Sequence, residues 1–114
     1  MPKLVYIAHP VAGDVKANVE DILRICKEMH TQEIVPFAPY LVALHYLDDH
    51  VEEERALGIA ANRECFHRRV MDEVWLTGSR ISRGMQEEIK LARQYDIPII
   101  CYNAALQGEL EKVI

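Results

Sequence analysis

Residues 3–8 are Lys-Leu-Val-Tyr-Ile-Ala, a continuous apolar run at the start of the chain. A run without alternating polar side chains is typical of a strand that is covered on both faces in a parallel sheet. A turn through Gly13 follows, and Asp14 is a favourable N-cap residue. Beyond it, apolar residues recur at spacings of three and four, which predicts an amphipathic helix of about four turns.

Strands and helices alternate along the rest of the chain. Strands are expected at 34–36, 70–77 and 97–101, helices at 52–69 and 82–95, and a short helix after Asn103. This order predicts one α/β domain over residues 1–114, a three-layer Rossmann or flavodoxin-like fold with a small parallel sheet and helices on both faces. Ligands bind such sheets at the carboxyl ends of the strands. The loops after Ala8 and Thr77 are therefore the expected site.

The composition narrows the classes of partner. The chain has 114 residues, half of them hydrophobic, as expected for one globular domain. Its net charge of −5 argues against binding to polymeric nucleic acid or to an anionic membrane, because both require basic patches. No apolar run approaches the ~20 residues that span a bilayer, and the N-terminus has no secretory signal pattern. The sequence therefore predicts a cytoplasmic protein.

Neither the cysteines nor the histidines follow a metal-ligand pattern. Cys26, Cys65 and Cys101 are too far apart for a zinc motif, and each lies in an apolar stretch, which is typical of reduced core residues. His9 differs from the other histidines because it lies where the first strand ends, beside the expected crevice. We expect neither a metal nor an organic cofactor.

Glu88 interrupts the apolar face of the helix expected at 82–95. At 100° per residue this face carries Met85, Ile89 and Ala92, with Glu88 in its middle, whereas Glu87 lies at its border. A carboxylate on a core face is usually paired or retained for chemistry, because burying it unpaired is costly. The alternative is that Glu88 faces solvent past the sheet edge and interacts only with the helix dipole.

The loop at 78–84 is rich in Gly, Ser and Arg and leads into this helix. Its Ser79 and Ser82 hydroxyls, its Arg80 and Arg83 side chains and the first amides of the helix could bind an anion or sugar hydroxyls. It is neither a Walker A loop nor a G-x-G-x-x-G loop. The alternative is that Ser82 is only an N-cap and the arginines are solvated.

Five segments carry a resemblance to a known family: Tyr6–Pro10 with Asn18, then 36–39, 71–76, 82–85 and 88–92. Together they cover nearly the whole chain and resemble the nucleoside 2-deoxyribosyltransferase-like superfamily. The chain is most similar to a small branch with a Ser-x-Gly-Met motif, and it also resembles the 2′-deoxynucleoside 5′-phosphate N-hydrolases.

This resemblance implies an enzyme that cleaves the N-glycosidic bond of a nucleoside or nucleotide, or that transfers its deoxyribosyl group. Glu88 would be the nucleophile that attacks the anomeric carbon, and Tyr6 would hold it. Glu64 would be a second carboxylate, at a position where the hydrolases have aspartate. Relatives complete their sites across a subunit interface, so a homodimer or larger homo-oligomer is expected. The substrate-binding residues would be His9, Ser79, Arg80, Ser82, Arg83 and Gly84.

The first loop departs from the pattern of the hydrolases. Residues 9–12 are His-Pro-Val-Ala, where the hydrolases carry a Gly-Ser-x-Arg phosphate-binding sequence. A phosphate would therefore have to rest on Arg80, Arg83 or a neighbouring subunit. Two other functions remain open: a module that binds a nucleotide without turnover, and a subunit that serves only in assembly.

Overall fold

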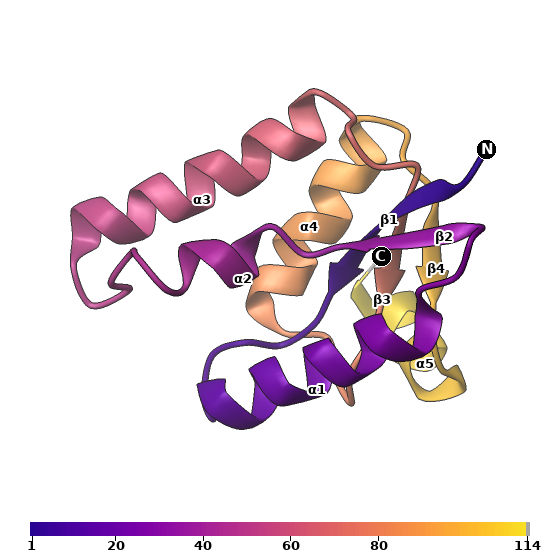
Figure 1. The fold of residues 1–114 in the computed structure, drawn as a ribbon, viewed down its shortest axis with the longest axis horizontal. Helices are drawn as coiled ribbons and strands as arrows, with labels where there is room; N and C mark the ends of the chain where they lie inside the picture. Colours follow the sequence, from indigo (N-terminus) through magenta and orange to yellow (C-terminus); the bar gives the residue numbers. More distant parts are fainter. Residues whose placement is uncertain (114) are drawn as a thin grey trace.

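The computed structural model describes residues 1–113 and has the predicted α/β architecture (Figure 1). Four parallel strands form one sheet in the order β2-β1-β3-β4. The elements are β1 (Lys3–Ala8), α1 (Val15–Met29), β2 (Ile34–Phe37), α2 (Tyr40–Ala43), α3 (Glu52–His67), β3 (Glu73–Leu76), α4 (Arg83–Gln94), β4 (Ile99–Cys101) and α5 (Ala104–Val113).

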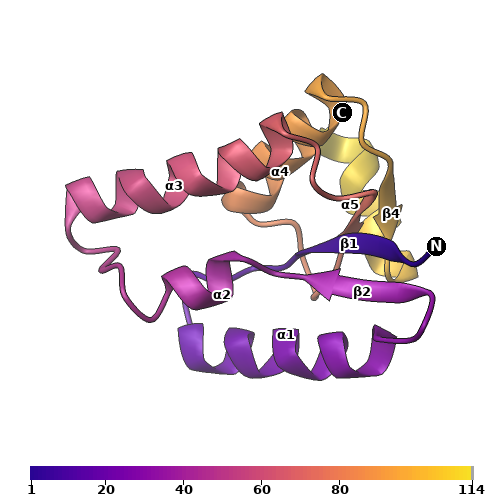
Figure 2. The same cartoon turned by 45° about the horizontal axis from the view of Figure 1, so that its top comes forward.

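The sheet lies between two layers of helices (Figure 2). Helix α1 covers one face, where Val5 and Ile7 of β1 pack with Ile22 and Ile25. Helices α3, α4 and α5 lie over the other face, where Tyr6 belongs to the second core cluster. Because successive side chains of a strand point to opposite faces, β1 supplies both clusters in alternation. The prediction of helices on both faces is confirmed.

The strand order also locates the expected crevice. The connection after β1 leads outward to β2, whereas the chain later returns to place β3 on the other side of β1. The sheet therefore has its switch point between β1 and β3, at the carboxyl ends where the loops after Ala8 and Leu76 begin. Both loops had been selected from the sequence.

Local signals set most helix boundaries. The Asp14 carboxylate accepts a hydrogen bond from the Ala17 amide at 3.1 Å, which confirms the N-cap of α1. The strand expected at 70–77 is shorter, because Arg69 adopts a φ of 51° and the chain pairs with β1 only from Glu73. The short helix α2 lies in a stretch for which the sequence predicted no element.

Helix α3 is the least buried of the long helices. It has 16 residues, and Phe66 is its one buried side chain. In Figure 1, α2 and the N-terminal half of α3 extend to one side of the sheet. None of the helices among residues 1–113 is both long and apolar enough to cross a membrane.

Candidate functional site

Three polar side chains from three elements meet on the α4 face of the sheet. The Tyr6 hydroxyl of β1 contacts the Glu88 carboxylate of α4, and it also lies 3.0 Å from Asn62 Oδ1 of α3. The Asn62 amide nitrogen lies 3.3 Å from Glu88 Oε2 and completes the set. The helix wheel is thus confirmed, because Glu88 faces the core and does not merely face solvent. Tyr6 also holds Glu88 as the family resemblance implied.

The surroundings of Glu88 are unusual for a carboxylate. Its partners are uncharged, and no ion pair involving Glu88 occurs within residues 1–113. Burial raises the pKa of Glu88 to about 7, although the hydrogen bonds with Tyr6 and Asn62 act in the opposite direction. Burial and the adjacent carboxylate also raise the pKa of Tyr6. Glu88 can therefore be either acid or carboxylate near neutral pH.

Glu64, the expected second carboxylate, lies elsewhere. Its side chain is half exposed and pairs with Arg68 at 2.8 Å on the outer surface of α3. Residues two positions apart on a helix point about 200° apart, so α3 directs Asn62 towards Glu88 and Glu64 away from it. The structure therefore does not bring Glu64 to Glu88, and the Asn62 amide is the α3 side chain that reaches Glu88.

A polar cleft of about 330 Å³ opens on the opposite face, beside α1. It lies at the carboxyl ends of β1, β3 and β4, and its volume is at the lower end of the range of small-molecule sites. Three of its side chains are basic, and Asp21 is the one carboxylate. The lining residues are His9, Pro10, Asn18, Asp21, Arg24, Ile25, Gly78, Ser79, Arg80, Tyr102 and Asn103.

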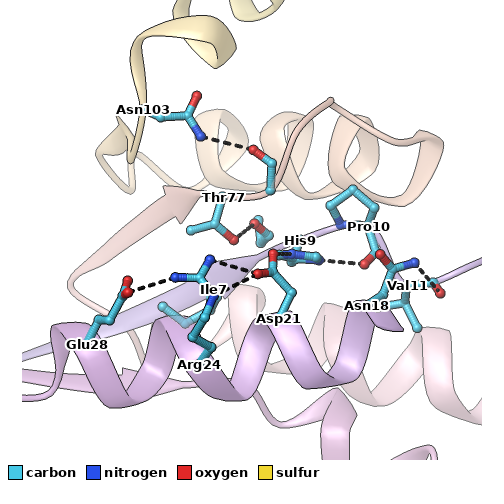
Figure 3. A network of polar contacts seen from close by, with 12 residues as sticks. Ile7, His9, Pro10, Val11, Asn18, Asp21, Arg24, Glu28, Thr77 and Asn103 are labelled. Carbon is cyan, nitrogen blue, oxygen red and sulfur yellow. Dashed lines mark hydrogen bonds and ion pairs between the residues drawn. The ribbon is translucent and has the colours of Figure 1, made fainter. Parts of the chain in front are cut away.

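A contact between the buried His9 ring and the partly exposed Asp21 carboxylate forms one wall of this cleft (Figure 3). His9 Nε2 lies 2.7 Å from Asp21 Oδ2, and His9 Nδ1 lies 2.6 Å from the Pro10 carbonyl oxygen. Both oxygens are acceptors, so each ring nitrogen of His9 faces a group that can accept a hydrogen bond. Hydrogen bonds from His9 and Arg24 lower the pKa of Asp21. The contacts fix the orientation of the His9 ring at the cleft.

Gly78 allows the loops after β1 and β3 to approach each other closely. Its φ is +87°, and a Cβ at this position would lie 2.8 Å from Pro10 Cδ and 3.2 Å from His9 Nε2. Its carbonyl accepts a hydrogen bond from the Asn103 side chain at 3.0 Å, which ties in the loop after β4. Only glycine combines this backbone conformation with this approach.

The substrate-binding residues predicted from the sequence fall into two groups. His9, Ser79 and Arg80 line the cleft, whereas Ser82, Arg83 and Gly84 do not. The Ser82 hydroxyl accepts the Met85 amide at 3.2 Å, so Ser82 acts as the N-cap of α4. The Glu109 carboxylate accepts the Ile81 amide nearby at 3.3 Å, which places a negative charge where a phosphate had been expected.

Sequence reasoning missed several residues of both regions. Asn62 carried one usable signal: it is a polar residue four positions before Phe66, on the inward face of α3. Asp21 lies four positions before Ile25 on α1 and beside its buried face. Tyr102 and Asn103 directly follow the last strand, at the same sheet edge as His9. In the part of the chain that the structure describes, no cluster of three or more His, Cys, Asp or Glu side chains is suited to a metal.

The fold and the two regions define a class: a flavodoxin-like α/β protein with a polar cleft at the switch point and a partly buried carboxylate on the opposite face. Residues 3–102 match the family model described as "Domain of unknown function (DUF7768)", and the chain belongs to this family. No curated protein matches the sequence.

One solved structure supports the fold assignment. It is the crystal structure of a conserved protein from Enterococcus faecalis V583, with 17% sequence identity and a TM-score of 0.57. The match covers 99% of this chain and 75% of that one. At this identity the likeness concerns the fold alone.

Proposed function

We propose that this protein cleaves the N-glycosidic bond of a nucleoside or nucleotide, or transfers its deoxyribosyl group, with Glu88 as the nucleophile. The observation that carries this proposal is the contact of Glu88 with Tyr6 and Asn62. A partly buried carboxylate without a cationic partner is costly to maintain, and such groups concentrate at catalytic sites. The family resemblance assigns the same residue as nucleophile.

The reaction would follow the retaining carboxylate mechanism. A Glu88 oxygen bonds to the anomeric carbon, and the carbon–nitrogen bond breaks with its electron pair leaving on the base, which takes up a proton. Water or a second base then attacks the glycosyl ester and restores the Glu88 carboxyl group. The Tyr6 hydroxyl holds Glu88 in place, and no cofactor is required. Glu64 has no role in this scheme.

A turnover assay tests this proposal. The purified protein is incubated with 2′-deoxynucleosides and their 5′-phosphates, with and without a second base, and free base or exchanged nucleoside is separated by chromatography. We expect product from the wild type and at least a ~1,000-fold loss in E88Q, because an amide cannot replace the nucleophile. E87Q is the matched control, because Glu87 is exposed and pairs only with Lys90. No product from any substrate, or equal product from E88Q, would contradict the proposal.

The second candidate function is binding of an anionic nucleotide without turnover. It is favoured by the cleft, whose lining includes His9, Arg24 and Arg80 but not Glu88. The guanidinium group of Arg80 has no ion pair within residues 1–113, so it is available to a phosphate. Tight nucleotide binding in calorimetry without release of base would favour this function.

We also propose that a second copy of the chain covers α3. Leu57 of this helix is 62% exposed. The helix begins with three consecutive glutamates, has Arg63 and His67 near its end, and is followed by Arg68 as the C-cap residue. Antiparallel packing of two copies would therefore set acidic ends against basic ends while burying Leu57 of each copy.

We propose the cytoplasm as the compartment of this protein. Cys26, Cys65 and Cys101 are free and partly buried, as is usual where thiols remain reduced. A disulfide in the protein isolated under non-reducing conditions, detected by mass spectrometry, would oppose this assignment.

A further inference from the structure

The Tyr6 hydroxyl, the Asn62 amide and Glu88 Oε2 form a triangle in which each group is within hydrogen-bonding contact of the other two. The three groups belong to β1, α3 and α4, so each contact joins two different elements. Three contacts need three protons, one for each pair of heavy atoms. Each of the three contacts must therefore have one group that donates the proton.

An ionised Glu88 leaves one of the three contacts without a proton. The Asn62 nitrogen supplies one proton, to Glu88, and the Tyr6 hydroxyl supplies one more. The third contact has no proton unless Oε2 of Glu88 carries it. The number of protons needed is the same if the oxygen and nitrogen of the Asn62 amide are exchanged. The nitrogen then donates to Tyr6, and the oxygen faces Glu88.

We propose that Asn62 is a positioning residue whose Oδ1 accepts the Tyr6 proton, so that Tyr6 no longer donates to Glu88 and Glu88 stays a carboxylic acid that donates to the Tyr6 oxygen in the ligand-free protein. The three hydrogen bonds form a ring, in which Glu88 donates to the Tyr6 oxygen, Tyr6 donates to Asn62 Oδ1, and the Asn62 nitrogen donates to Glu88. Opening the ring frees Glu88 to release its proton.

The groups around Glu88 support this arrangement. Tyr40 is the other titratable group whose charge would affect Glu88 and Tyr6, and its hydroxyl donates to the Ile7 carbonyl. No lysine, arginine or histidine forms an ion pair with Glu88 within residues 1–113. A proton is thus the available means of neutralising Glu88, and burial raises its pKa to about 7.

The ring also balances the proposed reaction, and this consequence rests on the proposed function. When the glycosyl ester forms, Glu88 gives up its proton while the departing base gains one, so acid plus nucleoside becomes ester plus neutral base. Hydrolysis of the ester restores the acid form of Glu88, because water adds its oxygen to the sugar and returns a proton to Glu88. A second carboxyl group is not needed, which agrees with the outward position of Glu64.

The protonation state is tested in the ligand-free wild-type protein. Infrared spectra are recorded across a pH series, and the carboxylic acid band of Glu88 is assigned by its absence in E88Q. We expect this band at acid and neutral pH and its loss at a midpoint of about 7. A Glu88 that is already ionised one to two pH units below neutrality would overturn the proposal. This measurement requires no substrate.

The role of Asn62 is tested with N62D, whose folding is checked by circular dichroism. Two carboxyl groups in the ring would share one proton. The midpoint for loss of the acid band should therefore be at least about one pH unit higher in N62D than in the wild type. E64Q, on the outer surface of the same helix, should leave the midpoint unchanged. A midpoint in folded N62D equal to that of the wild type would show that Asn62 does not act on Glu88.

These outcomes separate the ring from the proposed function. A protonated Glu88 that responds to N62D, in a protein that releases no base, would support the ring and contradict the glycosidase proposal. Release of base that depends on Glu88, with Glu88 ionised at neutral pH, would support the glycosidase and overturn the ring. If N62D fails to fold, the wild-type spectra still decide whether the ring is closed.

Discussion

Tyr6 and His9 are three positions apart in the sequence, and their side chains lie on opposite faces of the sheet. Tyr6 packs in the cluster beneath α4, whereas His9 pairs with Asp21 of α1. Residues an odd number of positions apart in a strand point to opposite faces, and His9, directly after β1, keeps this alternation. The residues expected to form one site therefore form a carboxylate cluster on one face and a cleft on the other.

The first prediction concerns stability and pH. The carboxyl group of Glu88 has an ordinary pKa of 4.5 when exposed, and burial raises it to about 7. Between these values the folded state binds more protons than the unfolded state, so the free energy of unfolding falls as pH rises. The fall is complete above the folded pKa and amounts to about 3 kcal/mol.

We expect E88Q to lack this decline, because an amide does not titrate. In urea denaturation, the free energy of unfolding of E88Q should be similar to that of the wild type at acid pH. Above neutrality it should be higher than that of the wild type. E87Q should keep the wild-type decline. Parallel stability curves for the wild type and E88Q would show that Glu88 titrates normally.

The second prediction compares two glycines with positive φ. G78A should lower the free energy of unfolding by about 2–4 kcal/mol, because it combines backbone strain with a clash against Pro10. G13A should cost only about 1–2 kcal/mol, because Gly13 has a φ of +101° but open space around its Cβ position. Thermal and urea unfolding measure the difference, and equal losses would show that the approach to Pro10 is not tight.

The third prediction concerns the cleft. A nucleoside 5′-phosphate should bind R80A about 10- to 100-fold more weakly than the wild type, because a charge-assisted hydrogen bond to the phosphate is lost. R83A is the matched control, because Arg83 lies three residues further along the chain, at the start of α4, but outside the cleft. Calorimetry with nucleotide and nucleoside measures both. Equal binding of the two ligands by the wild type would mean that the cleft holds no phosphate.

The fourth prediction concerns assembly. Light scattering at tens of micromolar should give the mass of a dimer or larger oligomer, and L57E should shift it to the monomer, because a charge would be buried at the α3 contact. L23E is the control, because Leu23 is similarly exposed, at 54%, but lies on α1 across the sheet. A monomeric wild type, or dissociation by L23E instead, would contradict the proposed contact.

Local patterns in the sequence determined most of the fold. The run at residues 3–8 predicted β1 with its observed bounds, Asp14 predicted the start of α1, and Ser82 predicted the start of α4. The inward position of Glu88 also followed from a helix wheel. These features depend on residues within one or two turns or along one strand, so their physical cause is present in a short stretch of sequence.

The tertiary structure alone decided which of these residues meet. Asn62 lies 56 positions from Tyr6 and 26 from Glu88, and their contact depends on the rotation of α3 against the sheet. That rotation turns Glu64 outward, although the family resemblance placed it at the site. Likewise, Tyr6 within β1 and His9 directly after it lie on opposite faces, against α4 and α1. Such contacts arise from the packing of whole elements, which no local pattern of residues specifies.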